Sequence, residues 1–257
     1  MSRVAAVLVT RDSQDYLSET LTSIEDQIRR PELRIAIDDG SLDETRSLLI
    51  GAGFTVNNAT SPATDTHTRI AHNFLQGVRA AQAAGADVVV LGDHDDRWHE
   101  TRVAHQVGVL EADPSIALVA SEAFLIDEWG VAIPGTLRDT FPVPEDFAEW
   151  SKRKQWRYAL RHSLATGGAS ALQPGALNDW SVPSGWLHDR WWSLQALRHD
   201  ALVIDPTPVI DYRLSADQQV GRDTGYQDDT RRWIWRKART GWTSATRTRQ
   251  AARLIRG

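Results

Sequence analysis

The chain has 257 residues, of which 41% are hydrophobic and 25% are charged, with a formal net charge of −5. These are ordinary values for a globular protein of one large domain or two small ones. The absence of cysteine excludes disulfides and thiolate zinc sites. No apolar run approaches the roughly 18 residues that a membrane span requires, and residues 1–3 lead into a predicted strand. We therefore expect a cytoplasmic protein without a signal peptide.

The charge is distributed unevenly along the chain. It holds 29 Lys and Arg and 34 Asp and Glu, and residues 230–257 contain nine of the basic residues and none of the acidic ones. This basic tail also contains Trp233, Trp235 and Trp242. Basic residues interleaved with tryptophan suit the anionic surface of a membrane, so we expect peripheral contact at its inner face. Nucleic acid attracts the same charges but is the less expected partner. The alternative is a helix docked on the acidic body.

Strands and helices alternate along the first half of the chain. A helix with its apolar face at Leu17, Leu21, Ile24 and Ile28 follows the first strand, and Asp12 or Ser13 can cap it. The predicted strands cover residues 4–9, 33–37, 54–56 and 88–91, and the further predicted helices cover 43–50 and 66–84. This alternation predicts an α/β fold with a Rossmann-like, mostly parallel sheet that helices flank on both faces.

The fourth strand ends in a cluster of acidic residues. Four apolar residues, Val88 to Leu91, are followed by Gly92 and then by Asp93, Asp95 and Asp96 within four positions. Like charges this close repel one another, and a hard divalent cation such as Mg²⁺ or Mn²⁺ would relieve the repulsion. Ligands of open α/β sheets bind beyond the carboxyl ends of the strands, where this cluster is expected. The alternative is a solvated acidic turn.

Helix and strand signals continue from residue 101 to residue 127, and residues 134–144 form the expected irregular connection. We divide the chain at residues 1–133, 134–225 and 226–257, the last being a basic helical tail. The family resemblance described next implies that 1–133 is a nucleotide-sugar-binding half and 134–225 an acceptor and catalytic-base half. The second half is expected to form a lobe on the same sheet. The sequence does not indicate an oligomeric state.

Three ordered blocks of the sequence carry a family resemblance. The first runs from Val7 to Gln27 and continues in Ile37-Asp38-Asp39-Gly40-Ser41. The second is the acidic run Asp93-His94-Asp95-Asp96-Arg97-Trp98, which is similar to a DxD element in its D-x-D-D-x-W form. The third begins at His188-Asp189 and ends at Val220-Gly221. Together they resemble family 2 glycosyltransferases, inverting enzymes of the GT-A fold that use nucleotide-sugars, and in particular a rhamnosyltransferase-like subgroup.

The resemblance implies roles for residues at three strand ends. Asp95, with help from Asp93 or Asp96, is expected to hold Mg²⁺ or Mn²⁺ against the diphosphate of the donor, and Asp93 also belongs to the nucleotide site. Asp39 is expected to accept a hydrogen bond from N3–H of a pyrimidine base. The remaining nucleotide contacts are assigned to Thr10, Asp12 and Arg69. Asn73 lies on the same helix face as Arg69, four residues later. Turn or helix-capping roles are the alternatives for Asp38 and Asp39.

The acceptor side is assigned to the third block. An inverting transfer requires a base on the acceptor hydroxyl, and Asp189 matches the family's base position. A helix N-cap is the alternative role for Asp189, and both roles are compatible. His188 and Trp186 are expected near the acceptor, and Gly168 is expected to let the backbone approach the sugar.

One position departs from the family pattern. Relatives often read Tyr-Arg-x-His, whereas this chain has Tyr212-Arg213-Leu214-Ser215, so a possible histidine ligand is replaced by Ser215. His94 or His99 could take its place.

The sequence leaves three functions open. The leading one is a metal-dependent inverting transferase that moves sugar from a UDP- or dTDP-sugar to a hydroxyl of a saccharide or lipid-linked acceptor, in cell-surface polysaccharide or glycolipid synthesis. The second is a metal-dependent phosphohydrolase built on the acidic run and His99. The third is a non-catalytic nucleotide-binding relative.

Overall fold

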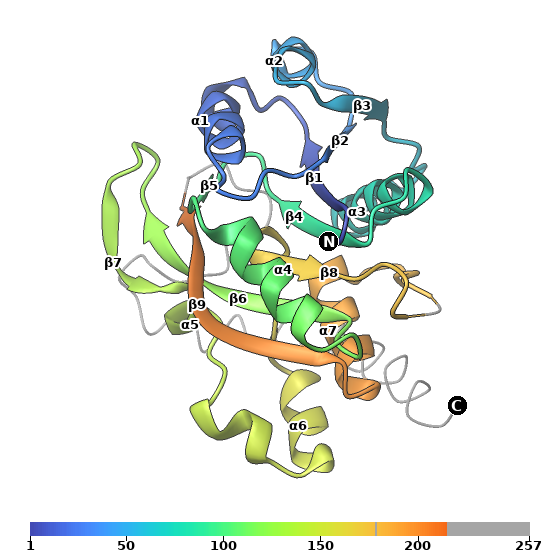
Figure 1. Ribbon diagram of the computed structural model, residues 1–257, viewed down its shortest axis with the longest axis vertical. Helices are drawn as coiled ribbons and strands as arrows, with labels where there is room; N and C mark the ends of the chain where they lie inside the picture. The colour runs from blue at the N-terminus through green and yellow to red at the C-terminus, as the bar shows by residue number, and fades with distance from the viewer. Residues whose placement is uncertain (178, 215–257) are drawn as a thin grey trace.

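The structure is a computed structural model that describes residues 1–177 and 179–214. Its helices and strands follow one another along the chain as shown in Figure 1. The elements of the first half are β1 (Val4–Thr10), α1 (Gln14–Glu25), β2 (Leu33–Asp38), α2 (Thr45–Gly51), β3 (Thr55–Asn58), α3 (Thr66–Ala83), β4 (Val88–Gly92), β5 (Arg97–Trp98) and α4 (Arg102–Ala112). Those of the second half are β6 (Leu118–Ile126), β7 (Ala132–Thr136), α5 (Leu137–Thr140), η1 (Glu145–Glu149), α6 (Lys152–Ala159), η2 (Gly167–Ala169), β8 (Ser170–Leu172), α7 (His188–Arg198) and β9 (Leu202–Arg213).

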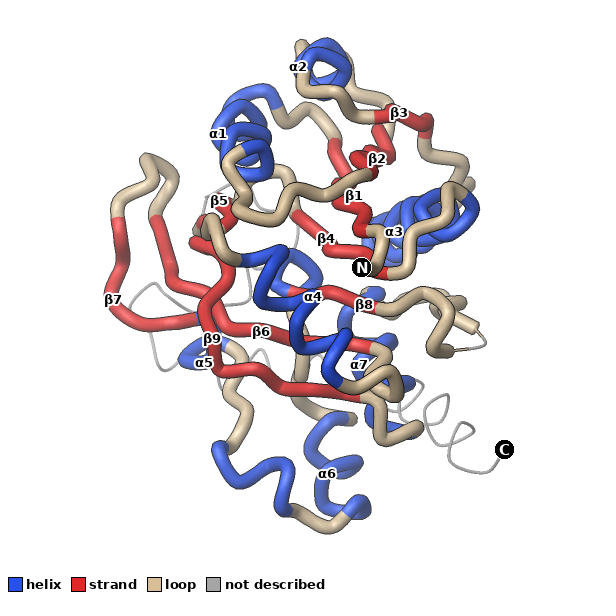
Figure 2. The backbone as a smooth tube through the Cα atoms, in the orientation of Figure 1, coloured by secondary structure: helices blue, strands red, loops and turns tan. Residues whose placement is uncertain are grey.

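Within the described residues the strands form one nine-stranded sheet in the order β3-β2-β1-β4-β8-β6-β9-β5, with β7 paired to β6. The strands from β3 to β4 are all parallel, as the strand–helix alternation predicts. Beyond β4, β8 runs antiparallel to both of its neighbours, and β9 runs parallel to β6. The predicted α/β sheet with flanking helices is therefore confirmed, and Figure 2 shows how the sheet curls between its two halves.

Each face of the sheet is covered by its own helices. Because successive strand residues point to opposite faces, Ala5 and Val7 of β1 pack under α3 and α7, whereas Val4, Ala6 and Leu8 pack under α1, α2 and α4. In Figure 1, α4 crosses in front of the sheet and α7 lies behind it. Two apolar cores thus hold the carboxyl ends of β1, β2 and β4 in fixed positions.

The helix predicted after β1 is shorter than its apolar pattern suggests. It ends at Glu25, and Ile28 is exposed rather than part of its buried face. Ser13 occupies the N-cap position, but its hydroxyl bonds the backbone of Arg11 instead of a helix amide. The prediction of Leu17, Leu21 and Ile24 as the buried face is correct.

None of the helices in residues 1–177 and 179–214 is both long and apolar enough to cross a bilayer. The predicted basic tail, with Trp233, Trp235 and Trp242, lies outside the described residues, as do Ser215 and Val220-Gly221. The division of the chain at residues 133 and 225 remains a prediction. The second half does add β8 and β9 to the same sheet as the first.

Candidate active site

The acidic run lies where β4 leaves the sheet, and η2 packs directly against it. A methyl group placed on Gly168 would lie 2.5 Å from Oδ2 of Asp96 and 2.7 Å from Oδ2 of Asp93. The two carboxylates therefore converge on one point of the backbone. Gly168 was predicted to let the backbone approach a sugar. The structure instead shows that the missing side chain makes room for these two carboxylates.

Burial and mutual repulsion disfavour charge in this cluster. Burial, followed by the charges of Asp95 and Asp189, raises the pKa of Asp93 to about 7. Burial and the charges of Asp95 and Asp93 raise the pKa of Asp96 well above its usual value. Tyr212 faces the same charges, and its pKa is raised first by burial and then by the acidic side chains. The cluster is thus an electrostatically strained site that favours a cation.

A cation also fits the hydrogen bonding of the cluster. Oδ2 of Asp96 is buried and has no hydrogen-bond partner among the described residues, which is costly unless a ligand satisfies it. Within the described part of the chain, no three His, Asp or Glu side chains converge on one metal position. Mg²⁺ in proteins commonly takes one or two carboxylates and fills its remaining positions with water and substrate phosphates. Asp93 and Asp96 meet that requirement, whereas a cage of three protein ligands is not present there.

A buried arginine lies beneath the cluster, and sequence reasoning missed it. Arg102 opens α4, is fully buried, and donates from Nη2 to the Leu91 carbonyl at 2.5 Å and from Nε to Gln106 at 3.2 Å. Its guanidinium stacks 3.9 Å from the centre of the Trp98 ring. Burial lowers the pKa of Arg102 to about 9, while Asp96 and Asp93 oppose that shift. Arg102 is therefore a built-in counter-charge for the two carboxylates.

Arg213 holds the loop that carries Asp95 and Asp96. Its Nε donates to the Asp95 carbonyl at 2.8 Å, and its backbone N–H donates to Oδ1 of Asp96 at 3.1 Å. The guanidinium lies 4.7 Å from the ring centre of Tyr16 and pairs with Glu19. The sequence singles out Tyr212-Arg213 only as part of a motif, and the structure shows that Arg213 fixes the acidic loop.

Asp189 lies at the second position of α7, next to the cluster. Its Oδ2 accepts the backbone N–H of Gly167 at 3.2 Å, and its Oδ1 accepts that of Arg190 at 2.6 Å. Leu187, not Asp189, occupies the N-cap position of α7. Burial raises the pKa of Asp189 to about 6, and its charge is among those that raise the pKa of Asp93. The carboxylate is thus oriented from two sides and is poised to titrate near neutral pH.

Two residues assigned to the acceptor have buried rings. The ring of Trp186 is 2% exposed and packs edge-on against Trp191, so it has no free face on which a sugar could stack. The His188 ring is buried between Phe74, at 3.9 Å between ring centres, and Trp192. Burial lowers the pKa of His188 to about 3, which keeps the ring neutral. The prediction for Trp186 was wrong, because its proximity to Asp189 in the sequence does not reveal that its ring is buried. Both ring nitrogens of His188 are buried without a partner among the described residues, so its assignment stays a prediction.

The residues assigned to the nucleotide gather at the ends of β1 and β2. Thr10 pairs with Asp38 across the two strands, and the Asp39 N–H donates to the Thr10 carbonyl at 2.9 Å. The Thr10 hydroxyl is buried without a partner among the described residues. Arg69 reaches Oδ2 of Asp39 at 2.7 Å, and Arg11 approaches the same oxygen at 3.7 Å.

Asp12 and Asn73 complete this side of the site. Asp12 has a positive φ of 44°, and its Oδ1 accepts the Leu42 N–H at 2.8 Å, so it joins the ends of β1 and β2. The amide of Asn73 is buried, and neither its oxygen nor its nitrogen has a partner in the described structure. Unsatisfied buried polar groups of this kind call for an explanation, and a ligand that bonds them is one.

His99 is not placed as a metal ligand. One ring nitrogen lies 2.8 Å from Asp211 and the other lies 3.2 Å from the Pro208 carbonyl. Both nitrogens are therefore occupied by β9, and the suggestion that His99 replaces the missing histidine is wrong.

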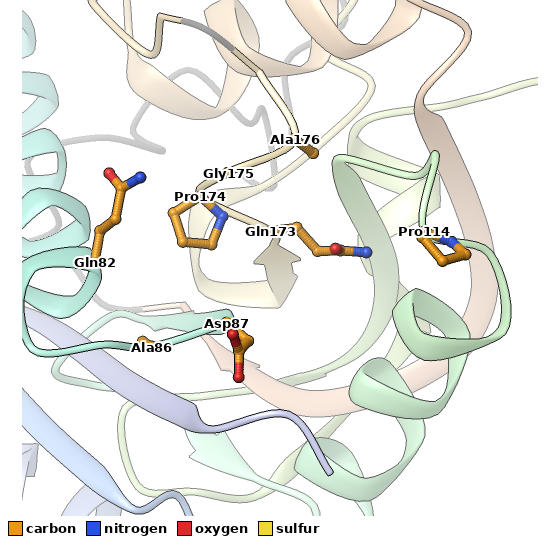
Figure 3. A pocket seen from close by; sticks show the side chains of 8 residues that line it. All are labelled: Gln82, Ala86, Asp87, Pro114, Gln173, Pro174, Gly175 and Ala176. Atoms are coloured by element: carbon orange, nitrogen blue, oxygen red, sulfur yellow. The ribbon is translucent and has the colours of Figure 1, made fainter.

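A surface hollow of about 310 Å³ lies elsewhere, at the opposite end of β4 from the acidic cluster (Figure 3). It is lined by residues that include Gln82, Asp87, Gln173 and Pro174. Asp87 directly precedes β4, and its carboxylate accepts the Arg3 N–H at 2.8 Å. The hollow contains none of the sequence-predicted site residues.

The raised pKa of Asp93 predicts a specific pH dependence of stability. The folded state holds the Asp93 proton up to about pH 7, whereas the unfolded chain loses it near pH 4. Folding therefore becomes less favourable as the pH rises through this window. In EDTA, the free energy of unfolding of Asp93→Asn should be higher than that of the parent by on the order of 3 kcal/mol at pH 8. At pH 4.5 the two free energies of unfolding should differ little.

Urea unfolding at the two pH values measures this difference. Protonation of His188 in the unfolded state acts in the opposite direction, but it is common to both proteins and cancels in the comparison. A pH-independent difference between variant and parent would show that the Asp93 carboxyl is not strained by its surroundings.

The chain is similar to a known protein family in sequence and to solved structures in fold. The family model described as Glycosyl transferase family 2 matches residues 5–134, while the curated proteins contain no significant match. Glucosyl-3-phosphoglycerate synthase from Mycobacterium tuberculosis, solved with Mn²⁺, UDP and glucosyl-3-phosphoglycerate, is 19% identical with a TM-score of 0.56, over 83% of this chain and 72% of that one.

The mannosyltransferase PcManGT from Pyrobaculum calidifontis, solved with GDP-Man and Mn²⁺, is 17% identical with a TM-score of 0.56, over 86% of this chain and 59% of that one. S. aureus TarS is 15% identical with a TM-score of 0.57, over 82% and 60% of the respective chains. At these identities the likeness shows the fold, and it confirms the predicted GT-A architecture.

Proposed function

This chain belongs to glycosyl transferase family 2, and on that premise we propose that it is a metal-dependent inverting enzyme that transfers sugar from a UDP- or dTDP-sugar to a hydroxyl acceptor. The observation that carries the proposal is the position of Asp189. Its carboxylate is held by two backbone amides and lies close enough to Asp93 to raise the pKa of that group. A base and a cation-binding pair therefore share one site.

Each part of the site has a task in such a transfer. Asp189 takes the proton of the acceptor hydroxyl as the new glycosidic bond forms. Asp39 accepts a hydrogen bond from N3–H of the base. Arg69 and Arg11 both approach Oδ2 of Asp39, so Oδ1 is the oxygen that can accept this bond. Asp95, with help from Asp93 or Asp96, would hold Mg²⁺ or Mn²⁺, which would supply Lewis-acid stabilisation of the departing diphosphate. The structural neighbours solved with UDP or GDP-Man and Mn²⁺ support this assignment by analogy of fold.

The finer assignments remain part of the proposal. The third sequence block supports a rhamnosyltransferase-like subgroup, and the basic tail supports a lipid-linked or saccharide acceptor at the inner membrane face, as in polysaccharide or glycolipid synthesis. A phosphohydrolase is less well supported, because His99 is bound to β9 and because Asp39 and Asp189 would have no role in it. A non-catalytic relative would not need the carboxylate of Asp189 beside the cluster.

The proposal predicts selection for the base. Uracil and thymine present an N3–H donor to Asp39, whereas cytosine presents an acceptor there. We expect UDP and dTDP, but not CDP, to stabilise the full chain in Mn²⁺ and to lose most of that effect in EDTA. Asp39→Ala should weaken UDP binding by about tenfold, the cost of a charge-assisted hydrogen bond.

Calorimetric titration of the three nucleotides measures this selection, and release of UDP or dTDP from a panel of nucleotide-sugars measures turnover. Asp87→Ala removes a carboxylate at the other end of β4 and serves as the control. Equal affinity for CDP and UDP would contradict the role of Asp39, and nucleotide binding with no turnover of any sugar would favour the non-catalytic relative.

A further inference from the structure

The hairpin between β6 and β7 presents an exposed tryptophan. Of the eight tryptophans in residues 1–177 and 179–214, only Trp129 is exposed, at 78%, and Val131 beside it is 61% exposed. Single exposed apolar residues are common and have no significance alone. The position of Trp129 beside the acidic loop, rather than its exposure, indicates a role for it.

The turn that carries Trp129 is held in place. Oδ1 of Asp127 accepts the Trp129 N–H at 3.0 Å and the Val131 N–H at 2.8 Å. Gly130 has a φ of 81°, which suits glycine, and its N–H donates to the Asp127 carbonyl. The backbone beneath the indole is therefore already ordered, so a ligand that contacts the ring does not have to order this turn.

One guanidinium joins this turn to the acidic loop. Nη1 of Arg213 donates to the carbonyls of Asp127 and Glu128 at 3.2 and 3.1 Å, while its Nε donates to the Asp95 carbonyl at 2.8 Å. The hairpin and the DxD loop are thus close enough for one guanidinium to donate to backbone carbonyls of both. The hairpin is also on the far side of β4 from β1 and β2, which carry the nucleotide residues. The turn of Trp129 is therefore close to the acidic loop and separate from the residues assigned to the nucleotide.

The chemistry around the turn suits a sugar. The groups nearest to Gly130 include Glu19 and Arg97, which pair at 2.9 Å and have half-exposed side chains. A saccharide ring offers a face of C–H groups and a rim of hydroxyls. A flat indole can cover the face, and the carboxylate and guanidinium can bond the rim.

We propose that Trp129, held by Asp127 and Arg213 beside the DxD loop, is the stacking platform for a sugar ring of the acceptor, with Glu19 and Arg97 bonding its hydroxyls. This deepens the proposed transferase function and rests on it. It assigns a saccharide acceptor, and it places the acceptor's ring on the β6–β7 hairpin and not on Trp186.

Fluorine NMR of the full chain labelled with fluorotryptophan tests this directly. The resonance of Trp129 is identified by its absence in Trp129→Phe, and the probes are the methyl glycosides of glucose, galactose, mannose and rhamnose in the presence of UDP and Mn²⁺. We expect at least one glycoside to shift this resonance saturably in the millimolar range. No shift with any of the four would overturn the proposal.

The affinity of the glycoside that shifts the Trp129 resonance is then measured by saturation-transfer NMR in a set of variants. The comparison separates stacking on the ring from other effects. Trp129→Ala should weaken the affinity by about tenfold, Trp129→Phe should keep most of it, and Ile28→Ala, an equally exposed apolar residue elsewhere, should leave it unchanged. Asp127→Ala should weaken it by loosening the turn, while Asp127→Asn, which can still accept the two amides, should restore it. Equal affinity in Trp129→Ala and the parent, or equal loss in Ile28→Ala, would overturn the proposal.

Different measurements test the transferase function and the role of Trp129 as a platform. Release of UDP or dTDP from nucleotide-sugars in water does not require the platform and is measured in the parent, with Ile28→Ala as the unchanged control. Loss of that release in the parent would reject the transferase, whereas normal release with no response of Trp129 to glycosides would reject only the platform.

Discussion

Asp189→Asn is expected to reduce sugar transfer by roughly 10²- to 10⁴-fold, the usual contribution of a positioned general base. The asparagine keeps the shape of the side chain but cannot take the acceptor proton. Nucleotide and metal affinity should stay within a few-fold, because the proposed role of Asp189 is on the acceptor hydroxyl. In the parent, transfer should fall as the pH drops below about 6, where Asp189 becomes protonated. The part of this acid limb that Asp189 contributes should be absent from the residual activity of the variant.

Asp15→Asn is the matched control for this experiment. Asp15 is the second residue of α1, as Asp189 is of α7, so both changes remove a charge from the first turn of a helix. Measurement of kcat and KM for both variants separates a helix-terminus effect from base catalysis. Near-normal transfer by Asp189→Asn would leave Asp189 as an acceptor of the Gly167 and Arg190 amides and would place the base elsewhere.

Gly168→Ala is expected to weaken Mn²⁺-dependent UDP binding by about 5- to 150-fold, equivalent to the 1–3 kcal/mol that overpacking typically costs. The added methyl would lie 2.5 Å from Asp96 and 2.7 Å from Asp93, so both carboxylates must move. The paired arrangement that favours a cation is then lost. Calorimetric titration of UDP in Mn²⁺ and in EDTA measures the effect.

Gly175→Ala is the control, because nothing lies within 4 Å of the position its methyl would take. Its UDP affinity should equal that of the parent. If Gly168→Ala also bound UDP as the parent does in Mn²⁺, the convergence of Asp93 and Asp96 would have no part in metal binding.

The sequence predicted the first half of the fold closely because its signals are local. Apolar runs such as Val88–Leu91 identify buried strands, and Leu17, Leu21 and Ile24 identify a helix face. The antiparallel insertion of the three-residue strand β8 between β4 and β6 has no comparable signal. Its position depends on pairing with strands distant in the chain, and a short strand carries too few residues to show a period.

The positions of candidate site residues were predictable where they follow a strand end, as for Asp39 and the acidic run. The role of a residue was not predictable where burial decides it. Trp186 and Trp129 look alike in sequence, yet one is in the core and the other is in solvent. Arg102 stands in an ordinary helical pattern beside Val103, and only the folded chain shows that the carboxylates lie above it.

The enclosed guanidinium of Arg102 also bears on how the protein is made. A newly synthesised chain must bring Asp93 and Asp96 together before any nucleotide arrives, and their repulsion opposes that step. Arg102 is part of the same chain, and its positive charge offsets part of the repulsion between the two carboxylates during folding. The sheet can therefore assemble with these carboxylates side by side before any cation is bound.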